Sequence, residues 1–400
     1  MKVLYVGAYL PYPLNSGGRI RSYHLLRELA ARHDVHLLAF SYAPQPGDLV
    51  ALRAICRSVR TVPAPPRPGG PAHRLVRLLR SPDDIVLGRS SSLMEQELSR
   101  SLESEQWDLL ILDELGTETY ARLTRGVPVV LSKHNCEWLL LRRLAAHKAR
   151  RPLAWVLARL EAMVVRRTET RAVSLVDRTI AVSEADRKAL RSGAPQARIG
   201  VVPNGVDTAY FRPEPAPESK RLVFTGAMFW YPNVEAALWF CRAVWPRVQR
   251  DVPDGELDLV GREPPASVQR LGQLSGVRVV GEVPDIRPYL SQAALYVAPL
   301  LSGSGTRLKV LEALAAGKAV VSTSIGVEGL DLESGRETVV ADEPASFAAA
   351  VAALLRDPGR RHTLGQEGRK TVEARYDWSV VLADLDHICV EVSSRRSEPC

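Results

Sequence analysis

The chain has 400 residues, of which 46% are hydrophobic and 24% charged, an ordinary composition for a soluble globular protein with two domains of roughly 200 residues each. Its net charge is +8, and its five cysteines (Cys56, Cys136, Cys241, Cys389 and Cys400) show neither CxxC nor Cys/His ligand spacing. This spacing argues against a zinc site and a disulfide framework, and it fits a reducing cytoplasm.

The apolar start of the chain, "MKVLYVGAYLPYPLNSGG", is broken by prolines and glycines within about a dozen residues. We therefore expect a buried first strand rather than a signal peptide. No apolar run reaches the length of about 20 residues that a membrane-spanning helix needs. The nearest candidate, "PLAWVLARLEAMVV", carries Arg159 and Glu161, so we expect a soluble protein.

Short β-rich segments alternate along the chain with helical patterns such as "SYHLLRELAARH". The segments are "KVLYVG", "DVHLLAF", "DLLILD", "VPVVLS", "RTIAVS" and "IGVVP", then "RLVFTG", "ELDLVG", "VRVVG", "AALYVAP", "KAVVST" and "TVVA". Most are continuous hydrophobic runs, as in strands buried on both faces of a parallel sheet. The series restarts after a proline-rich linker, residues 203–220. The order predicts an α/β fold of two doubly wound domains, residues 1–202 and 221–376, facing across a cleft with ligands at the carboxyl ends of the strands.

The positive charge is concentrated in two stretches. Residues 142–171 hold nine cations against two carboxylates, and "HRLVRLLR" at 73–80 places arginines beside leucines at helical spacing. One interpretation is a solvated helix face, and the other is attraction to anionic lipid headgroups. Nucleic acid is a less suitable partner, because the sequence shows no zinc finger, RNP-type pattern or helix-turn-helix signature.

The turn after the first strand is not a dinucleotide-binding GxGxxG motif. Gly17 and Gly18 within it fit either a plain tight turn or a close backbone approach to a phosphate at the next helix N-terminus. "AAGKAVVST" near residue 318 is not a phosphate-binding P-loop, because Glu312 stands where its first glycine is required.

Several motifs follow one another in an order that closely resembles the GT-B glycosyltransferases of family 4. They are "VPVVLSKHN", "DRTIAVSEAD", "VVPNGVDTAYFRP", "LVFTGAMFWYPN", "GEVPDIRPYLSQAALYVAP" and "SGSGTRLKVLEALAAG". The resemblance extends from Gly17 to "YDWSVVLADL", whose helix (377–394) would cross back to the first domain. Members with "GxRLKxxEA" add sugars to lipid-linked or exported polysaccharides.

The resemblance implies roles for individual residues. His134 would sit by the donor sugar, Glu312 would hold the nucleotide ribose, and the region of Val283 would contact the base. Gly17 and Gly18 would face the donor diphosphate or the acceptor. The remaining donor-binding residues would be Gly226, Gly303, Ser304, Gly305 and Thr306.

The sequence departs from the family at two places. The first glutamate of the family's E-x7-E pattern falls on Ser304, and "GAMFWYPNVEAA" lacks the Arg and Lys that many members use to neutralise the diphosphate. Arg307 and Lys309 are candidates to replace those cations. We also expect Ser304 or Thr306 to cap the following helix. The aromatic run 229–231 fits either the cleft lining or a core.

We therefore expect a retaining glycosyltransferase that uses a nucleotide-diphosphate sugar and neither metal nor cofactor. No DxD signature stands in a plausible strand-end loop, so cations and helix N-termini would stabilise the leaving diphosphate. The expected acceptor is a glycan or lipid-linked intermediate, and the expected location is the cytoplasm or the inner face of the cell membrane. The alternatives are a sugar-nucleotide epimerase and a non-catalytic nucleotide-sugar-binding protein.

Overall fold

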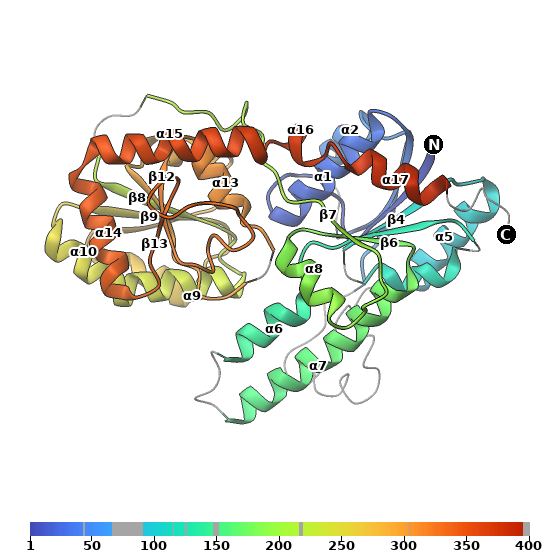
Figure 1. The fold of residues 1–400 in the computed structure, drawn as a ribbon, viewed down its shortest axis with the longest axis horizontal. Coiled ribbons are helices and arrows are strands. Elements are labelled where there is room, and N and C mark those ends of the chain that lie inside the picture. Colours follow the sequence, from blue (N-terminus) through green and yellow to red (C-terminus); the bar gives the residue numbers. More distant parts are fainter. Residues whose placement is uncertain are drawn as a thin grey trace. The chain divides into compact units, whose positions relative to one another are not determined.

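The computed structural model describes residues 1–42, 45–65, 91–114, 116–124, 126–146, 152–215, 219–303 and 305–394. These residues form two compact units (Figure 1). The first unit runs from Met1 to Pro203 and also includes the described residues from Leu382 onward, and the second runs from Asn204 to Val381.

The first unit contains a seven-stranded sheet in the order β3-β2-β1-β4-β5-β6-β7, and the neighbouring strands pair in parallel. The strands are β1 (Lys2–Gly7), β2 (Asp34–Ser41), β3 (Ser58–Pro63), β4 (Leu109–Asp113), β5 (Val129–Ser132), β6 (Arg178–Ala181) and β7 (Ile199–Val201). The order reverses between β1 and β4. In open parallel sheets, ligands bind at the carboxyl ends of the strands beside such a reversal.

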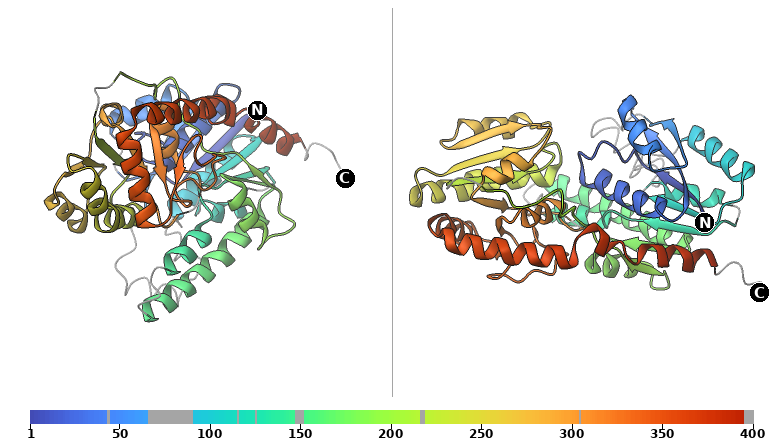
Figure 2. Two further views of the ribbon diagram at one scale, coloured as in Figure 1. Left: turned by 60° about the vertical axis from the view of Figure 1, so that its left-hand side comes forward. Right: turned by 90° about the horizontal axis from the view of Figure 1, so that it is seen from above.

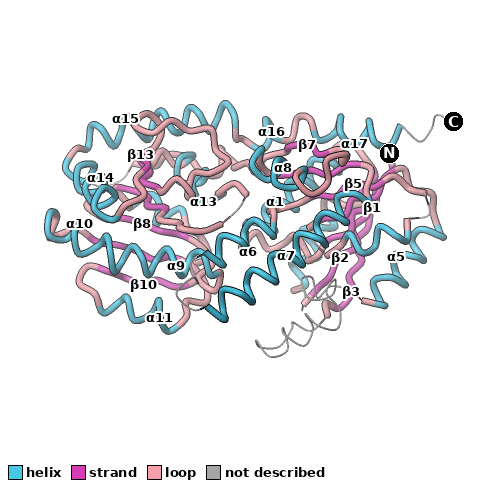
Figure 3. The backbone as a smooth tube through the Cα atoms, turned by 60° about the horizontal axis from the view of Figure 1, so that its bottom comes forward, coloured by secondary structure: helices cyan, strands magenta, loops and turns pink. Residues whose placement is uncertain are grey.

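Helices accompany this sheet. They are α1 (Gly17–Ala30), α2 (Pro46–Arg53), α5 (Ser92–Ser104), η1 (Glu118–Leu123), α6 (Glu137–Ala146), α7 (Pro152–Leu175), α8 (Glu184–Arg191) and α17 (Leu385–Ser394). Figures 1 and 3 show α6 and α7 side by side. Although it comes last in the chain, α17 packs on α1, β4 and β5 (Figure 2). The predicted return of the chain to the first unit is confirmed from Leu382 onward, whereas residues 377–381 of the expected helix belong to the second unit.

The second unit is built on a six-stranded parallel sheet in the order β10-β9-β8-β11-β12-β13. The strands are β8 (Arg221–Thr225), β9 (Glu256–Val260), β10 (Val277–Gly281), β11 (Leu295–Ala298), β12 (Ala319–Ser322) and β13 (Val339–Val340). The helices are α9 (Tyr231–Trp239), η2 (Phe240–Val244), α10 (Trp245–Asp251), α11 (Ala266–Gln269), η3 (Arg270–Gln273), α12 (Arg287–Gln292), α13 (Leu308–Ala315), α14 (Pro344–Arg356), α15 (Pro358–Arg375) and α16 (Trp378–Val381). Here the reversal lies between β8 and β11.

Both sheets are buried as the hydrophobic runs predict. In the first unit Val6, Leu110 and Leu131 are each fully buried, and in the second unit so are Leu222 and Val297. Aromatic rings fill the layer beneath α14, where Phe347 meets Trp239 and Phe240 edge-on at 5.7 Å between ring centroids. A doubly wound α/β fold is thus shown for both units.

The aromatic residues 229–231 do not form a core, because they are 45–50% exposed. From Asn204 onward, the described part of the expected linker belongs to the second unit, where Thr208 Oγ1 donates to Asp377 Oδ2 over 2.6 Å. The basic stretch 73–80 lies outside the described residues. None of the helices in the described part of the chain is both long and apolar enough to cross a membrane.

Candidate active site

In the first unit, polar side chains gather where β4 and β5 end. Gly7, the last residue of β1, pairs in register with Asp113, the last residue of β4, which in turn pairs with Ser132 at the end of β5. The segments that follow these strands carry Tyr9 and His134. The register therefore brings these side chains to one edge of the sheet, beside the reversal of strand order.

The His134 ring lies between carboxylates. Its Nε2 is 2.9 Å from Asp113 Oδ1, and its Nδ1 is 3.0 Å from both Tyr9 Oη and Glu114 Oε2. Tyr9 Oη also donates to Glu114 Oε2 over 2.5 Å. Burial disfavours a charged ring, but Asp113 and Glu114 outweigh it and raise the pKa of His134 to about 9. His134 is therefore an imidazolium at neutral pH.

The two predicted glycines begin helix α1. A Cβ atom at Gly18 would clash with Tyr9 Oη and would stand 3.2 Å from His134 Nδ1, so glycine is needed for α1 to approach this group. Gly17 is exposed at the first position of the helix, after the N-cap residue Ser16. Gly18 thus packs against Tyr9 and His134. The expected phosphate contact of both glycines stays a prediction.

In the second unit, the expected cap of α13 is wrong. The helix begins at Leu308 with Arg307 as N-cap residue. Thr306 Oγ1 instead accepts a hydrogen bond from the backbone N–H of Asn204, the first residue of the second unit, over 3.3 Å. Ser304 lies outside the described residues.

The small residues before α13 make room for Arg307. The guanidinium folds back over the loop, where Nη1 donates to Gly305 O over 3.0 Å, and a Cβ atom at Gly303 would clash with it. Gly303 and Gly305 have φ angles of 147° and 73°, in a region that favours glycine. The loop therefore holds a cation at the start of α13.

Lys309 reaches the turn after β8. Its Nζ donates to Asn233 Oδ1 over 2.6 Å and lies 4.6 Å from the Phe224 ring centroid, and a Cβ atom at Gly226 would clash with it. Asn233 is fixed in turn by its bond to Ala227 O over 2.9 Å. The structure thus brings the predicted residues Gly226 and Lys309 together, at the turn whose own sequence has no cation.

Burial shifts the pKa of both charged groups on α13 toward neutrality. It lowers the pKa of Lys309 to about 7, with help from the Arg307 charge. It raises the pKa of Glu312 to about 7, although the Lys309 charge opposes that shift. Such perturbed values are frequent at functional sites, where an arriving ligand supplies the missing partner charge or hydrogen bond.

Val283 lies half-buried in the loop between β10 and α12, and its expected contact with a base stays a prediction. In the same loop, Ile286 is the N-cap residue of α12, and the Asp285 carboxylate one position earlier accepts from Arg287 N over 2.9 Å.

Sequence reasoning missed Glu235, which approaches the loop before α13. Its Oε2 accepts from Ser302 Oγ over 2.8 Å, so a carboxylate from α9 stands at the loop that leads into α13. It also missed Asn233. This asparagine stands in the first turn of α9, directly after the turn that contains Gly226, and that position could have indicated a polar group at the site. Both residues lie within "GAMFWYPNVEAA", a stretch in which only the missing cations and the aromatic run were interpreted.

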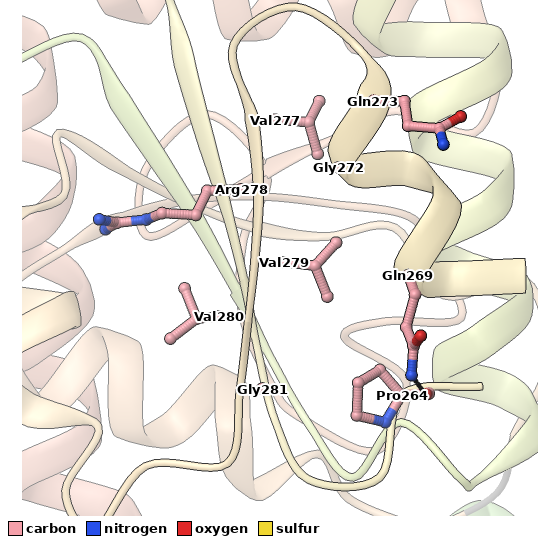
Figure 4. Close-up of a pocket in the computed structure, with 9 residues that line it drawn as sticks. All are labelled: Pro264, Gln269, Gly272, Gln273, Val277, Arg278, Val279, Val280 and Gly281. Carbon is pink, nitrogen blue, oxygen red and sulfur yellow. Dashed lines mark hydrogen bonds between the residues drawn. The ribbon is translucent and has the colours of Figure 1, made fainter. Parts of the chain in front are cut away.

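A separate hollow of about 630 Å³ lies at the outer edge of the second sheet, between β10 and the α11–η3 segment (Figure 4). Figure 4 shows Val277 and Val279 on the side of that segment, with Arg278 pointing to the opposite face. Arg278 is occupied by two hydrogen bonds to Asp258, of 2.8 and 2.6 Å. The hollow shares no residue with the Lys309 group, so we do not assign it to that site.

Two doubly wound parallel units, with polar groups at the carboxyl edges of both sheets, define the GT-B class of α/β proteins. Residues 16–210 match the family model described as Glycosyltransferase Family 4, and residues 219–357 match the one described as Glycosyl transferases group 1. The chain belongs to the GT-B glycosyltransferases of family 4, as its motif order predicted.

Individual relatives agree with this assignment. The chain is 31% identical to a phosphatidyl-myo-inositol mannosyltransferase of Mycolicibacterium smegmatis over 48% of this chain and 52% of the relative. It thus spans about half the length of that relative. Among solved structures, sucrose-phosphate synthase of Thermosynechococcus elongatus has a TM-score of 0.74 at 17% identity, covering 99% of this chain and 100% of that one. Anabaena HepE in complex with UDP has a TM-score of 0.67 at 14% identity, covering 98% and 100%.

Proposed function

We propose that the protein transfers a sugar from a nucleotide-diphosphate sugar to a hydroxyl group of a glycan or lipid-linked acceptor, with retention of configuration and without a metal ion. The observation that carries the proposal is the position of Lys309, whose ammonium reaches Gly226 and Asn233 beyond the end of β8. It supplies the cation that this turn lacks. The UDP complex of Anabaena HepE, which shares the fold, supports a nucleotide-sugar donor.

The proposed binding mode follows from the spacing on α13. A diphosphate beside Lys309 and Arg307 would have its charge balanced at the helix N-terminus. Glu312 lies three residues after Lys309 and so on the same side of the helix. Its carboxylate can accept hydrogen bonds from the two hydroxyls of a ribose.

In the proposed reaction, the bond between the anomeric carbon and the diphosphate oxygen breaks and the acceptor oxygen bonds to the same face of that carbon. The leaving phosphate takes the acceptor proton. Lys309 and Arg307 would stabilise the negative charge that develops on this phosphate. Such electrostatic stabilisation of the transition state is usually the largest single contribution to the rate enhancement. A protonated Lys309 is needed for this role.

Ligand binding tests the proposal first. A thermal-shift panel of UDP-, GDP- and dTDP-sugars should raise the melting temperature with at least one nucleotide, because a ligand that binds only the folded state stabilises it. With UDP, for example, Lys309→Met should weaken binding about ten- to a hundredfold while hardly affecting uridine. Glu312→Gln should weaken both ligands.

A matched control is Lys370→Met, which removes a lysine that pairs with Glu367 on the exposed surface of α15. This variant should bind like wild type. If no nucleotide raises the melting temperature, or if Lys309→Met binds UDP as wild type does, the donor site is wrong.

A membrane-facing surface is the second part of the proposal. Helix α7 exposes Val156, Leu160 and Met163, at 44–55% of their side-chain area and at helical spacing. Arg159 and Arg166 are exposed beside this stripe, and Arg159 lies 5.2 Å from the Trp155 ring. Apolar side chains flanked by arginines fit an anionic bilayer surface, where a lipid-linked acceptor would lie.

Co-sedimentation with liposomes tests this surface. Binding should rise with the fraction of anionic lipid and fall with salt, because each cation near the surface contributes about 1 kcal/mol that salt screens. Leu160→Glu should reduce binding. Equal binding to neutral and anionic vesicles would contradict an electrostatic attachment, and binding to neither would indicate that α7 is an ordinary solvated helix.

A further inference from the structure

Glu114 has an unusual backbone at the carboxyl end of β4. Its φ angle is 75°, in the left-handed region that costs a non-glycine residue about 1–3 kcal/mol. Its N–H donates to Ser132 O over 2.8 Å, so β5 holds the residue in this conformation. The backbone thus directs the Glu114 side chain toward Tyr9 and His134.

The Glu114 carboxylate is the most accessible charged group of this cluster. Its side chain is 16% exposed, compared with 6% for His134 and 1% for Asp113. Tyr9 Oη and His134 Nδ1 both bond to its Oε2, and Gly18 lets α1 close over that contact. Two donors therefore hold a carboxylate in place at a sheet edge where solvent reaches it.

The ring of His134 has little capacity left for a ligand. Asp113 occupies its Nε2, and Glu114 and Tyr9 occupy its Nδ1. A sugar hydroxyl could reach the ring only by displacing one of these partners, two of which carry the opposite charge. The expected contact of His134 with a donor sugar stays a prediction.

We propose that Glu114 binds hydroxyl groups of the acceptor, and that Tyr9 and His134 position its carboxylate. The inference rests on the proposed function and names the substrate class for the first unit. A carboxylate accepts hydrogen bonds from hydroxyls and repels phosphates. With Asp113 beside it, this edge suits an uncharged polyol part of the acceptor, such as a sugar or cyclitol ring.

The test compares Glu114→Gln with wild type, using the nucleotide sugar that the thermal-shift panel selects. The acceptor probes are D-glucose, D-mannose and myo-inositol, and the readout is released nucleoside diphosphate. Glu114→Gln should raise the acceptor KM about ten- to a hundredfold, the effect of losing one charge-assisted hydrogen bond, while the nucleotide Kd stays within twofold. The matched control is Glu97→Gln, a surface carboxylate of α5 that pairs with Arg100 and should leave both constants unchanged.

Coupling between the residues tests the positioning role. Tyr9→Phe and His134→Gln should each raise the acceptor KM, and each should add little in a background that already carries Glu114→Gln, because residues that act through one group are not additive. An unchanged acceptor KM in Glu114→Gln overturns the inference, as does a panel in which no polyol accelerates release by the wild type. A wild type that binds no nucleotide contradicts the proposed function itself, and it is recognised before any variant is made.

Discussion

The positive charge of His134 depends on two carboxylates that come from one strand end. Asp113 and Glu114 are neighbours in the sequence, but the left-handed backbone at Glu114 lets both reach the same ring from opposite sides. A single histidine in "SKHN" shows none of this. The sequence identified the position of His134 at a strand end, whereas the partners that determine its charge depend on the register of β4 and β5.

Titration of His134 by NMR would check that charge. We expect an apparent pKa near 9 in the wild type, well above the ordinary value of about 6.5. Because the folded-state pKa is raised, the pairing stabilises the fold fully below pH 6.5 and the contribution is lost as the pH rises through 9. Glu114→Gln should lower the pKa of His134, and an unshifted value in that variant would contradict the described contact.

The lowered pKa of Lys309 has the opposite consequence for binding. Above pH 7 the free ammonium loses its proton, so the affinity for UDP should fall between pH 7 and 9. The phosphate itself, with a second pKa of about 6, is already ionised in this window. Calorimetric titration across the window would show the loss, and Lys309→Met should bind weakly with a flat profile. A flat profile in the wild type would mean that Lys309 does not face the diphosphate.

At the level of elements, the twelve strand segments chosen from hydrophobic runs are all strands in the structure. The sequence reasoning missed β3, because this edge strand pairs only with β2 and buries just Val62. It also misplaced the start of α13, since Thr306 had a partner in Asn204 that no local pattern reveals. Local periodicity therefore predicts buried strands well. It fails for an exposed edge strand, and it fails where a hydrogen-bond partner far away in the sequence determines where a helix begins.

A buried ion pair lies between α7 and the segment that leads into α6. Glu169 Oε1 on α7 lies 2.8 Å from Lys133 Nζ, and its Oε2 accepts a hydrogen bond from Trp138 N over 2.8 Å, which fixes the start of α6. Both side chains are at most 2% exposed. Glu169→Gln should lower the unfolding free energy by about 1.5–3 kcal/mol, because it removes the carboxylate that pairs with the buried Lys133 while Glu118 and Glu137 remain nearby.

Denaturant unfolding would measure that loss, with Glu161→Gln on the same helix as the control. Glu161 is only half-buried, so its variant should stay within about 0.5 kcal/mol of wild type. A loss below 1 kcal/mol in Glu169→Gln would indicate that water or another cation replaces the pair at little cost.

On the scale of the whole molecule, the first unit is discontinuous, because α17 completes it from the far end of the sequence. The resemblance implied this return, whereas hydrophobic pattern alone does not say which sheet a last helix covers. Leu385 is 1% exposed on this helix, whereas Val390 on the same helix is 43% exposed. Leu385→Ala should therefore destabilise the first unit by about 2–5 kcal/mol.

Hydrogen exchange would localise the effect of Leu385→Ala. Peptides from β4 and β5 should lose protection, because both strands contact α17, while peptides from β8 in the second unit should keep it. Val390→Ala should exchange like wild type. A uniform loss over both units would mean that they unfold as one cooperative block.

The discontinuity also sets an order of events during synthesis on the ribosome. The second unit is made from one uninterrupted stretch and can fold as soon as that stretch has emerged. The first unit emerges earlier, yet the face of β4 and β5 that α17 covers must wait until the second unit has been translated. At about 5–20 residues per second, this wait lasts on the order of ten seconds or more. During that time the apolar face is accessible to chaperones. A ribosome that stalls while it translates the second unit would leave a first unit that lacks α17 and cannot complete its fold.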